Sequence, residues 1–212
     1  MEQSENGKGK KVLGVEQHLS GLGPKLRDII LGGQDGLVNV LGIILAVAIA
    51  TNDKNVVIVA GLAATFAEAI SMGAVAYTST KAAKQYYLSE VEREKREIEQ
   101  MPEAEVEEIR QIYYNKGFRG KLLSDIVKKI TSDKKVWLDT MMLEELRLAP
   151  IEAAAPLRSA LIVGFSSLFG SLIPLSPFFF AAVKTSIFAA LVISVITLFA
   201  TGSFKAKITV GS

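Results

Sequence analysis

The sequence predicts an all-α, multi-pass transmembrane protein with a helical cytoplasmic domain inserted between its second and third spans. Three observations predict this class. Hydrophobic residues make up 50% of the 212 residues. They are concentrated in four long blocks, each close to the roughly 20 apolar residues that a helix needs to cross a bilayer. Most charged residues fall instead between the second and third blocks, in a segment whose pattern is periodic at helical spacing.

The composition excludes several kinds of chemistry. The chain contains no cysteine, which excludes disulfides, thiolate metal sites and thiol nucleophiles. The single histidine, His18, excludes His-based zinc sites and His-dependent catalytic triads. Di-iron carboxylate enzymes normally use Glu-x-x-His pairs, so we expect no enzyme. A net charge of +2, without a basic patch interleaved with aromatic residues, argues against a nucleic-acid partner.

Residues 25–80 hold the first two predicted spans, with apolar blocks at residues 29–50 and 56–77. Only a short polar connection separates the two blocks, which predicts an antiparallel pair of helices. Glycine and alanine are frequent in both blocks, and small residues let membrane helices approach closely.

Residues 150–204 hold the third and fourth predicted spans, with apolar blocks at residues 157–175 and 178–204. Two prolines lie where the blocks meet, and proline disfavours a continuous helix. We therefore expect the sequence Pro-Leu-Ser-Pro at residues 174–177 to form the corner between the two spans.

The positions of lysine and arginine predict the orientation. Basic residues occur in the polar segment 1–24, throughout the region between spans two and three, and again in residues 205–212, whereas the short connections contain only Lys54. Because basic flanks stay on the cytoplasmic side, we place the N-terminus, the inserted domain and residues 205–212 there. The polar segment has no apolar stretch typical of a signal peptide, so the first span would direct membrane insertion.

Residues 81–149, hereafter the insert, are predicted to form a small bundle of helices. The helix of span two has no breaker after Tyr77 and should continue into the insert. Pro102 suits the first turn of a helix, Gly117 suits the end of one, and Ser132 or Asp133 suits an N-cap. The predicted segments are residues 81–99, 102 to about 117, 121–130 and 134–148.

The insert contains side chains that suit a divalent metal ion. Three pairs are spaced by three or four residues, so that each pair shares one helix face: Glu94 with Glu97, Glu105 with Glu108, and Met141 with Glu145. A turn at Pro102 could bring the first two pairs together. Converging carboxylates repel one another unless a cation neutralises them, and a thioether shifts the preference towards ions such as Fe²⁺. The alternative is a solvated charged face with pairs along each helix.

Three charged residues lie inside the apolar blocks: Asp35, Glu68 and Lys184. A charge that faces lipid costs at least a few kcal/mol, so each is a functional candidate. Glu68 and Met72 are four residues apart and share one face of the second span. The alternatives are a structural ion pair between Lys184 and either acid, an Asp35 that lies at the membrane surface, and a Lys184 that extends to the far surface.

Five stretches resemble the vacuolar iron transporter family. They are LRDIILGGQDGL at 26–37, AEAISMGAVAYTSTKA at 67–82, REKREIEQMPEAEVEEI at 93–109, WLDTMMLEEL at 137–146 and IPLSP at 173–177. Together they extend over nearly all of residues 25–207 in the order of the family, which makes the resemblance specific.

The resemblance implies a homodimeric transporter that moves Fe²⁺, and Mn²⁺ or a similar ion such as Zn²⁺ or Co²⁺, out of the cytosol in exchange for protons. The divalent ion is then the substrate, and lipid, protons and a second copy of the chain are the partners. The expected location is the cell membrane of a prokaryote, or the vacuolar or another organelle membrane of a eukaryote.

The resemblance also implies roles for individual residues. Asp35 and Met72 would lie on the ion path within the membrane, with Glu68 as a candidate carrier of protons or ions. Members of the family have five spans, so residues 205–212 would lead towards a fifth span absent from the four blocks. A membrane-anchored module that binds or senses metal without transport is the alternative function. The cytoplasmic metal ligands would be Glu94, Glu97, Glu105, Glu108, Met141 and Glu145.

Overall fold

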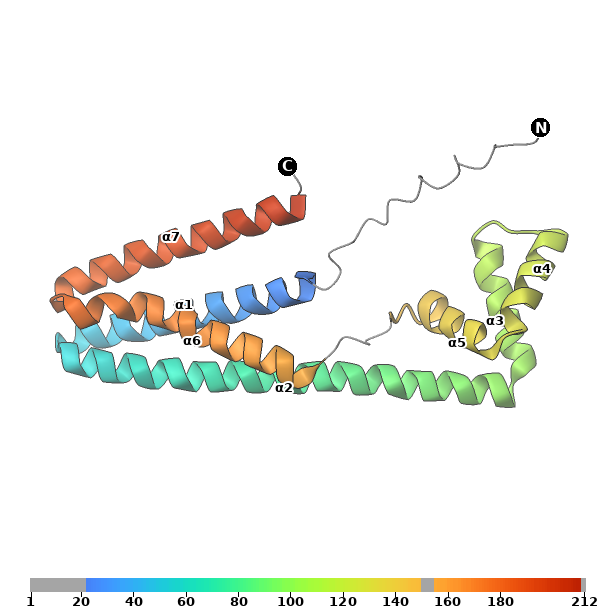
Figure 1. Cartoon of the computed structure of the whole chain (residues 1–212), viewed down its shortest axis with the longest axis horizontal. Coiled ribbons are helices and arrows are strands. Elements are labelled where there is room, and N and C mark those ends of the chain that lie inside the picture. Colours follow the sequence, from blue (N-terminus) through green and yellow to red (C-terminus); the bar gives the residue numbers. More distant parts are fainter. Residues whose placement is uncertain (1–21, 150–154, 211–212) are drawn as a thin grey trace, which may run out of the picture. The chain divides into compact units, whose positions relative to one another are not determined.

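The structure is a computed structural model that describes residues 22–149 and 155–210, and every regular element in these ranges is a helix (Figure 1). Almost all of the polar segment 1–24 lies outside the described residues. Residues 205–210 continue the last helix. The elements are α1 (Leu22–Thr51), α2 (Lys54–Gln100), α3 (Pro102–Asn115), α4 (Gly120–Thr131), α5 (Lys134–Thr140), the π-helical turn η1 (Met141–Glu145), α6 (Pro156–Phe180) and α7 (Val183–Val210).

Within residues 22–149 and 155–210, four helices, α1, α2, α6 and α7, are long and apolar enough to cross a membrane, in agreement with the four predicted spans. The chain is therefore an integral membrane protein. Helix α2 has 47 residues, or about 70 Å at ~1.5 Å per residue, more than twice the ~30 Å hydrocarbon core of a bilayer. Its apolar part ends near residue 77, so the charged remainder extends beyond the span, as predicted from the absence of a breaker.

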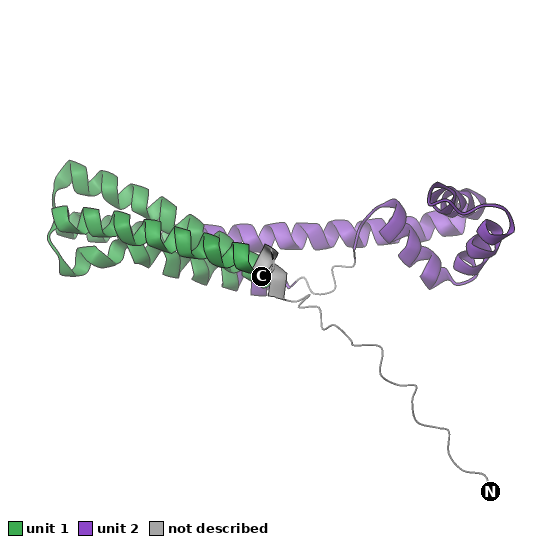
Figure 2. Ribbon diagram, turned by 90° about the horizontal axis from the view of Figure 1, so that it is seen from above, with its two compact units in different colours: residues 1–70, 162–212 green, residues 71–161 purple. Residues whose placement is uncertain are grey.

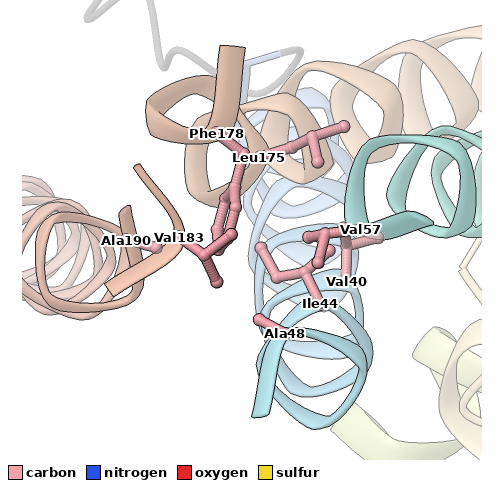
Figure 3. Close-up of a cluster of buried hydrophobic side chains, with 8 residues drawn as sticks. All are labelled: Val40, Ile44, Ala48, Val57, Leu175, Phe178, Val183 and Ala190. Carbon is pink, nitrogen blue, oxygen red and sulfur yellow. The ribbon is translucent and has the colours of Figure 1, made fainter. Parts of the chain in front are cut away.

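The chain divides into two compact units (Figure 2). The first contains residues 1–70 and 162–212, and the second contains residues 71–161. The first unit is held together by apolar side chains from α1, α2, α6 and α7 (Figure 3). Its buried members are Val40, Ile44, Ala48, Val57, Leu175, Phe178, Val183 and Ala190.

Glycines allow α1 and α6 to pack backbone against backbone. A Cβ atom added at Gly32 would overlap with the carbonyl oxygen of Val163, and one at Gly36 would overlap with the carbonyl oxygen of Ser167. Small residues at four-residue spacing are typical of such close contacts between membrane helices. The small-residue content of the first block therefore serves the contact with α6.

The prediction of a corner at residues 174–177 is wrong, because Pro174 and Pro177 lie inside α6 and the chain turns after Phe180. Pro177 has no N–H for the carbonyl oxygen of Ile173, and the hydroxyl of Ser176 donates to that oxygen instead at 2.8 Å. Membrane helices tolerate proline where a neighbouring hydroxyl supplies the missing donor. Near the end of α6, the Pro177 carbonyl accepts the N–H of Ala181 at 3.1 Å and also the hydroxyl of Ser186, from the start of α7, at 3.1 Å.

The second unit contains the insert, in which α3, α4 and α5 pack around a separate apolar core. The cap at Asp133 is confirmed, because its carboxylate accepts hydrogen bonds from the backbone N–H groups of Lys135 and Val136. Gly117, which follows α3, has a φ of +100°, as expected for the residue after a helix end. The buried members of this core are Ile98, Ile109, Leu123, Val127, Ile130, Trp137 and Met141.

The last predicted helix, residues 134–148, is shorter than expected. It ends with the π-helical turn Met141–Glu145, in which the N–H of Leu146 donates to the carbonyl of Met141 at 3.2 Å. Arg147 then adopts a φ of +54°, which ends the helical geometry. Side-chain periodicity does not distinguish a wide turn from an ordinary one, so the sequence did not show this change.

Candidate functional site

Three carboxylates of the insert converge from three different elements. Glu94 lies on α2, Glu105 on α3 and Glu145 on η1, and one oxygen of each lies within 4.8 Å of the others. Glu94 and Glu105 are 1% and 4% exposed, whereas Glu145 is exposed. The cluster is therefore a buried pair of acids with a third acid at its rim.

The apolar core of the insert positions the two buried acids. Glu94 precedes the core residue Ile98 by four positions on α2, and Glu105 precedes the core residue Ile109 by four positions on α3. Residues four apart lie one above the other on a helix face. When the two isoleucines enter the same core, the two glutamates are therefore brought towards each other.

The π-helical turn brings the third acid to the cluster. Met141 begins the turn and is completely buried in the insert core, while Glu145 ends it and joins the carboxylates. A π-helical turn is rare, and such turns are frequent at functional sites. The two side chains predicted as a pair therefore lie in different places. The thioether of Met141 is in the insert core, and the carboxylate of Glu145 is at the cluster.

The buried carboxylates lack partners that would offset their burial. Oxygen Oε2 of Glu94 and Oε2 of Glu105 are buried without a hydrogen bond from any described residue. A buried charged group without a partner is costly, by several kcal/mol in typical cases. A cation bound between these oxygens would remove that cost, which is the reason to regard the cluster as a candidate metal centre.

The electrostatics of the cluster agree with its geometry. Burial, reinforced by the charges of Glu145 and Glu105, raises the pKa of Glu94 to about 7. Burial, reinforced by Glu108 and Glu145, likewise raises the pKa of Glu105 to about 7. Burial and the neighbouring Glu108 also raise the pKa of Glu145. The acids of the cluster therefore hold their protons to a higher pH than an isolated glutamate does.

The remaining predicted acids lie at the edge of the cluster. The charge of Glu97 acts on Glu94, Glu105 and Glu145, and that of Glu108 acts on Glu105 and Glu145. Glu97 also pairs with Arg93 at 3.2 Å. The five glutamates thus belong to one electrostatic group, and oxygen-rich groups of this kind suit divalent cations.

A second polar group lies within the first unit, where α1 and α2 meet. The Oε1 atom of Glu68 accepts a hydrogen bond from Nδ2 of Asn39 at 3.1 Å, and the carboxyl of Asp35 lies within hydrogen-bonding reach of Glu68. Met72 is half-buried one helical turn after Glu68. Lys184 is exposed, and within residues 25–149 and 155–207 it forms no ion pair with either acid.

Sequence reasoning did not include Asn39 among the site residues. Asn39 is the uncharged polar residue of this group, and its side chain is exposed on α1. Its position four residues after Asp35, on the same helix face, was the signal that could have identified it.

Comparison with known proteins identifies the family of the chain. The sequence profile of the VIT family matches residues 26–212. Vacuolar iron transporter 1 of Arabidopsis thaliana is 32% identical to the chain, over 92% of the chain and 78% of the relative. Vacuolar iron transporter 1 of Tulipa gesneriana is 31% identical over 87% of the chain and 75% of the relative. The vacuolar iron transporter of Plasmodium berghei (strain Anka) is 36% identical over 87% of the chain and 71% of the relative.

These relatives are transporters and not enzymes, in agreement with the absence of an enzyme motif from the sequence. Both the profile and the relatives extend over most of the chain, from the first span through the insert to α7. The chain therefore belongs to the VIT family.

Proposed function

We propose that the chain is a proton-coupled transporter of divalent metal, with Fe²⁺ as its main substrate, that exports the ion from the cytosol. The observation that carries this proposal is the convergence of Glu94, Glu105 and Glu145 in a chain with four membrane-spanning helices. The relatives named as iron transporters favour Fe²⁺. Mn²⁺, Zn²⁺ and Co²⁺ accept similar oxygen-rich ligand sets and are further candidate substrates.

The insert is the proposed capture site, on the cytoplasmic side of the membrane. Buried oxygens without hydrogen-bond donors favour a tightly held cation over water. The basic flanks of the spans favour the cytoplasmic location. The proposed ligands are Glu94, Glu97, Glu105, Glu108, Met141 and Glu145, of which Met141 would act as a soft ligand from the core.

The proposed path through the membrane passes Asp35, Glu68 and Met72. The two acids interact in the middle of apolar helices, where a charge that faces lipid is costly. The neighbouring Asn39 is exposed in the single chain. A second copy of the chain that covers this polar stripe would remove it from lipid, and for this reason we propose a homodimer.

Proton coupling follows from the ligand chemistry. A carboxylate must lose its proton before it binds metal, so metal entry releases protons and metal release takes them up. A proton gradient directed into the cytosol would then drive the ion out. Carboxylates at both the insert and the membrane path provide this exchange along the route.

The test is uptake of Fe²⁺ into proteoliposomes under a proton gradient, comparing the parent chain with Asp35→Ala and with Glu105→Ala/Glu108→Ala. We expect uptake to be lost in Asp35→Ala and weakened in the double variant. A matched control is Glu103→Ala/Glu107→Ala, which removes two exposed acids from the same helix, α3.

The outcomes distinguish a transporter from a membrane-anchored module that only binds or senses metal. Uptake by the parent that depends on Asp35 and on the Glu105/Glu108 pair, but not on the control pair, supports a transporter supplied by its insert. Fe²⁺ binding without uptake by the parent would contradict transport and would favour the alternative, a membrane-anchored module that binds or senses metal.

A further inference from the structure

We infer that Asn39 is a positioning residue of the membrane path, whose side-chain amide holds the Glu68 carboxylate beside Asp35. The inference rests on the proposed transport function, because it assigns a role in the same path. It starts from a hydrogen bond between two polar side chains in neighbouring apolar helices, Nδ2 of Asn39 on α1 and Oε1 of Glu68 on α2, at 3.1 Å.

The helix geometry places Glu68 between two groups of α1. Asp35 and Asn39 are four residues apart on α1, so their side chains lie on one face. Glu68 interacts with both, since it accepts from the amide and lies within hydrogen-bonding reach of the Asp35 carboxyl. Glu68 of α2 therefore interacts with both polar residues of this α1 face.

The two acids would separate without such a donor. Neighbouring carboxylates repel each other, and the repulsion is strong where little water screens it. A glutamate side chain has several rotatable bonds and could turn away from Asp35. A hydrogen bond to a charged acceptor is stronger than one between neutral groups, so the Asn39 amide can hold the Glu68 carboxylate in place.

The neutral amide suits this role better than a basic side chain. A lysine or arginine at position 39 would hold Glu68 equally well but would cancel its negative charge. The amide orients Glu68 and leaves the charges of both acids available for a divalent cation. The nitrogen must face Glu68, because an ionised carboxylate only accepts hydrogen bonds, and an amide nitrogen is not a metal ligand.

The transport test uses Asn39→Ala and Asn39→Leu, with Fe²⁺ uptake into proteoliposomes measured over a range of concentrations. Asn39→Leu has nearly the same size as the parent residue but has no donor for Glu68 and adds no charge. We expect both variants to raise KM for Fe²⁺ by about 10-fold, which corresponds to the loss of one hydrogen bond to a charged group, with a smaller change in kcat.

The control is Thr65→Val, an isosteric change on α2 one turn before Glu68. The Thr65 hydroxyl is buried and donates to the carbonyl of Gly61 at 2.8 Å, away from Glu68, so KM should be unchanged. If Asn39→Ala leaves KM unchanged, the positioning role is wrong. If Asn39→Leu leaves KM unchanged while Asn39→Ala raises it, the effect of alanine comes from the lost volume and not from the lost donor, which also overturns the inference.

A second readout does not depend on transport. Dicyclohexylcarbodiimide modifies carboxyl groups in apolar surroundings, and the modification of Glu68 can be followed by mass spectrometry on the full chain in detergent. We expect Mn²⁺ to slow the modification in the parent and in Thr65→Val, but not in Asn39→Ala. If the parent does not transport, the proposed function fails, and loss of this protection still supports the role of Asn39. Equal protection in the parent and in Asn39→Ala would overturn it.

Discussion

At the scale of single residues, the chemistry of the chain is concentrated in a few carboxylates that the fold holds in unfavourable surroundings. Glu94 and Glu105 are almost completely buried and have raised pKa values. Burying these two carboxylates costs free energy, and a divalent cation bound between them would remove that cost. Strongly shifted carboxylates with a shared physical cause are typical of functional sites.

The raised pKa values predict how the metal-free insert responds to pH. In the folded chain Glu94 and Glu105 hold their protons up to a pH of about 7, whereas in the unfolded chain they lose them near 4.5. The folded state therefore binds more protons between these values. The stabilisation of the folded state by this proton binding is fully present below the unfolded pKa. It is lost as the pH rises through the folded pKa.

We expect the free energy of unfolding of the metal-free insert to fall between pH 5 and about 7.5. The measurement is denaturant unfolding with a chelator present, followed by the fluorescence of Trp137, the single tryptophan of the chain, which lies in the insert core. The control is Glu94→Gln/Glu105→Gln, in which the decrease should be much smaller. Equal pH dependence in the two proteins would refute the assignment of the shift to these acids.

At the scale of elements, each unit depends on local contacts that single substitutions can test. In the membrane unit, α1 and α6 meet through glycines without side chains between them. In the insert, α5 begins with a capped turn that leads directly to Trp137 and η1. A larger residue at the glycine contact should overpack the two helices. Loss of the cap should instead leave backbone N–H groups at the start of α5 without an acceptor.

We expect Gly36→Ala to lower the thermal stability of the full chain in detergent. The new Cβ would overlap with the Ser167 carbonyl, and overpacking of this kind typically costs about 1–3 kcal/mol. Gly42→Ala is the control on the same helix, because beyond the local backbone of α1 no atom of the described residues lies within 4 Å of the added Cβ. Gly42→Ala should be neutral or stabilising, since alanine favours a helix more than glycine does. Similar losses in both variants would argue against the close contact of α1 with α6.

We expect Asp133→Ala to destabilise the insert by about 1 kcal/mol, the usual cost of removing an N-cap. The lost bonds are those from the backbone N–H groups of Lys135 and Val136, at 2.8 and 3.2 Å. Unfolding followed by Trp137 fluorescence gives the change directly. Asp125→Ala, an exposed acid on α4, is the control and should have little effect.

At the scale of the whole molecule, the chain combines a unit of membrane helices with a unit built around the carboxylate cluster. Membership of the VIT family connects both units to transport in the relatives. If the insert captures metal, ligand binding should stabilise the unit that contains the cluster, because an ion that binds only the folded state shifts the unfolding equilibrium.

We expect Mn²⁺ at about 100 times its Kd to raise the free energy of insert unfolding by about 2.7 kcal/mol, as monitored by Trp137. Removing the ion with a chelator should reverse the effect. Glu94→Gln/Glu105→Gln should abolish it, and Glu103→Gln, an exposed acid on α3, should not. Stabilisation that persists in the double variant would place the ion elsewhere.

Part of the candidate site could be predicted from the sequence because helix phase is a local property. Residues three or four apart share a face, so the pairing of Glu94 with Glu97 and of Glu105 with Glu108 was already evident. Local phase does not give the distance between faces of different helices. The convergence of Glu94, Glu105 and Glu145, and the hydrogen bond from Asn39 to Glu68, required the packed structure.

By itself the sequence determined the number of spans, the continuation of α2 beyond the membrane, the cap at Asp133 and the membership of the family. These properties depend on hydrophobic length, on local hydrogen bonding and on motif order. The tertiary structure alone decided that the prolines of α6 lie within the helix, that a π-helical turn presents Glu145, and which acids are buried. Which acids are buried depends on partners distant in sequence, because Glu94, Glu105 and Glu145 meet only where folding packs their helices together. The path of α6 through its prolines depends on which acceptor the Ser176 hydroxyl takes, and helical periodicity does not specify that choice.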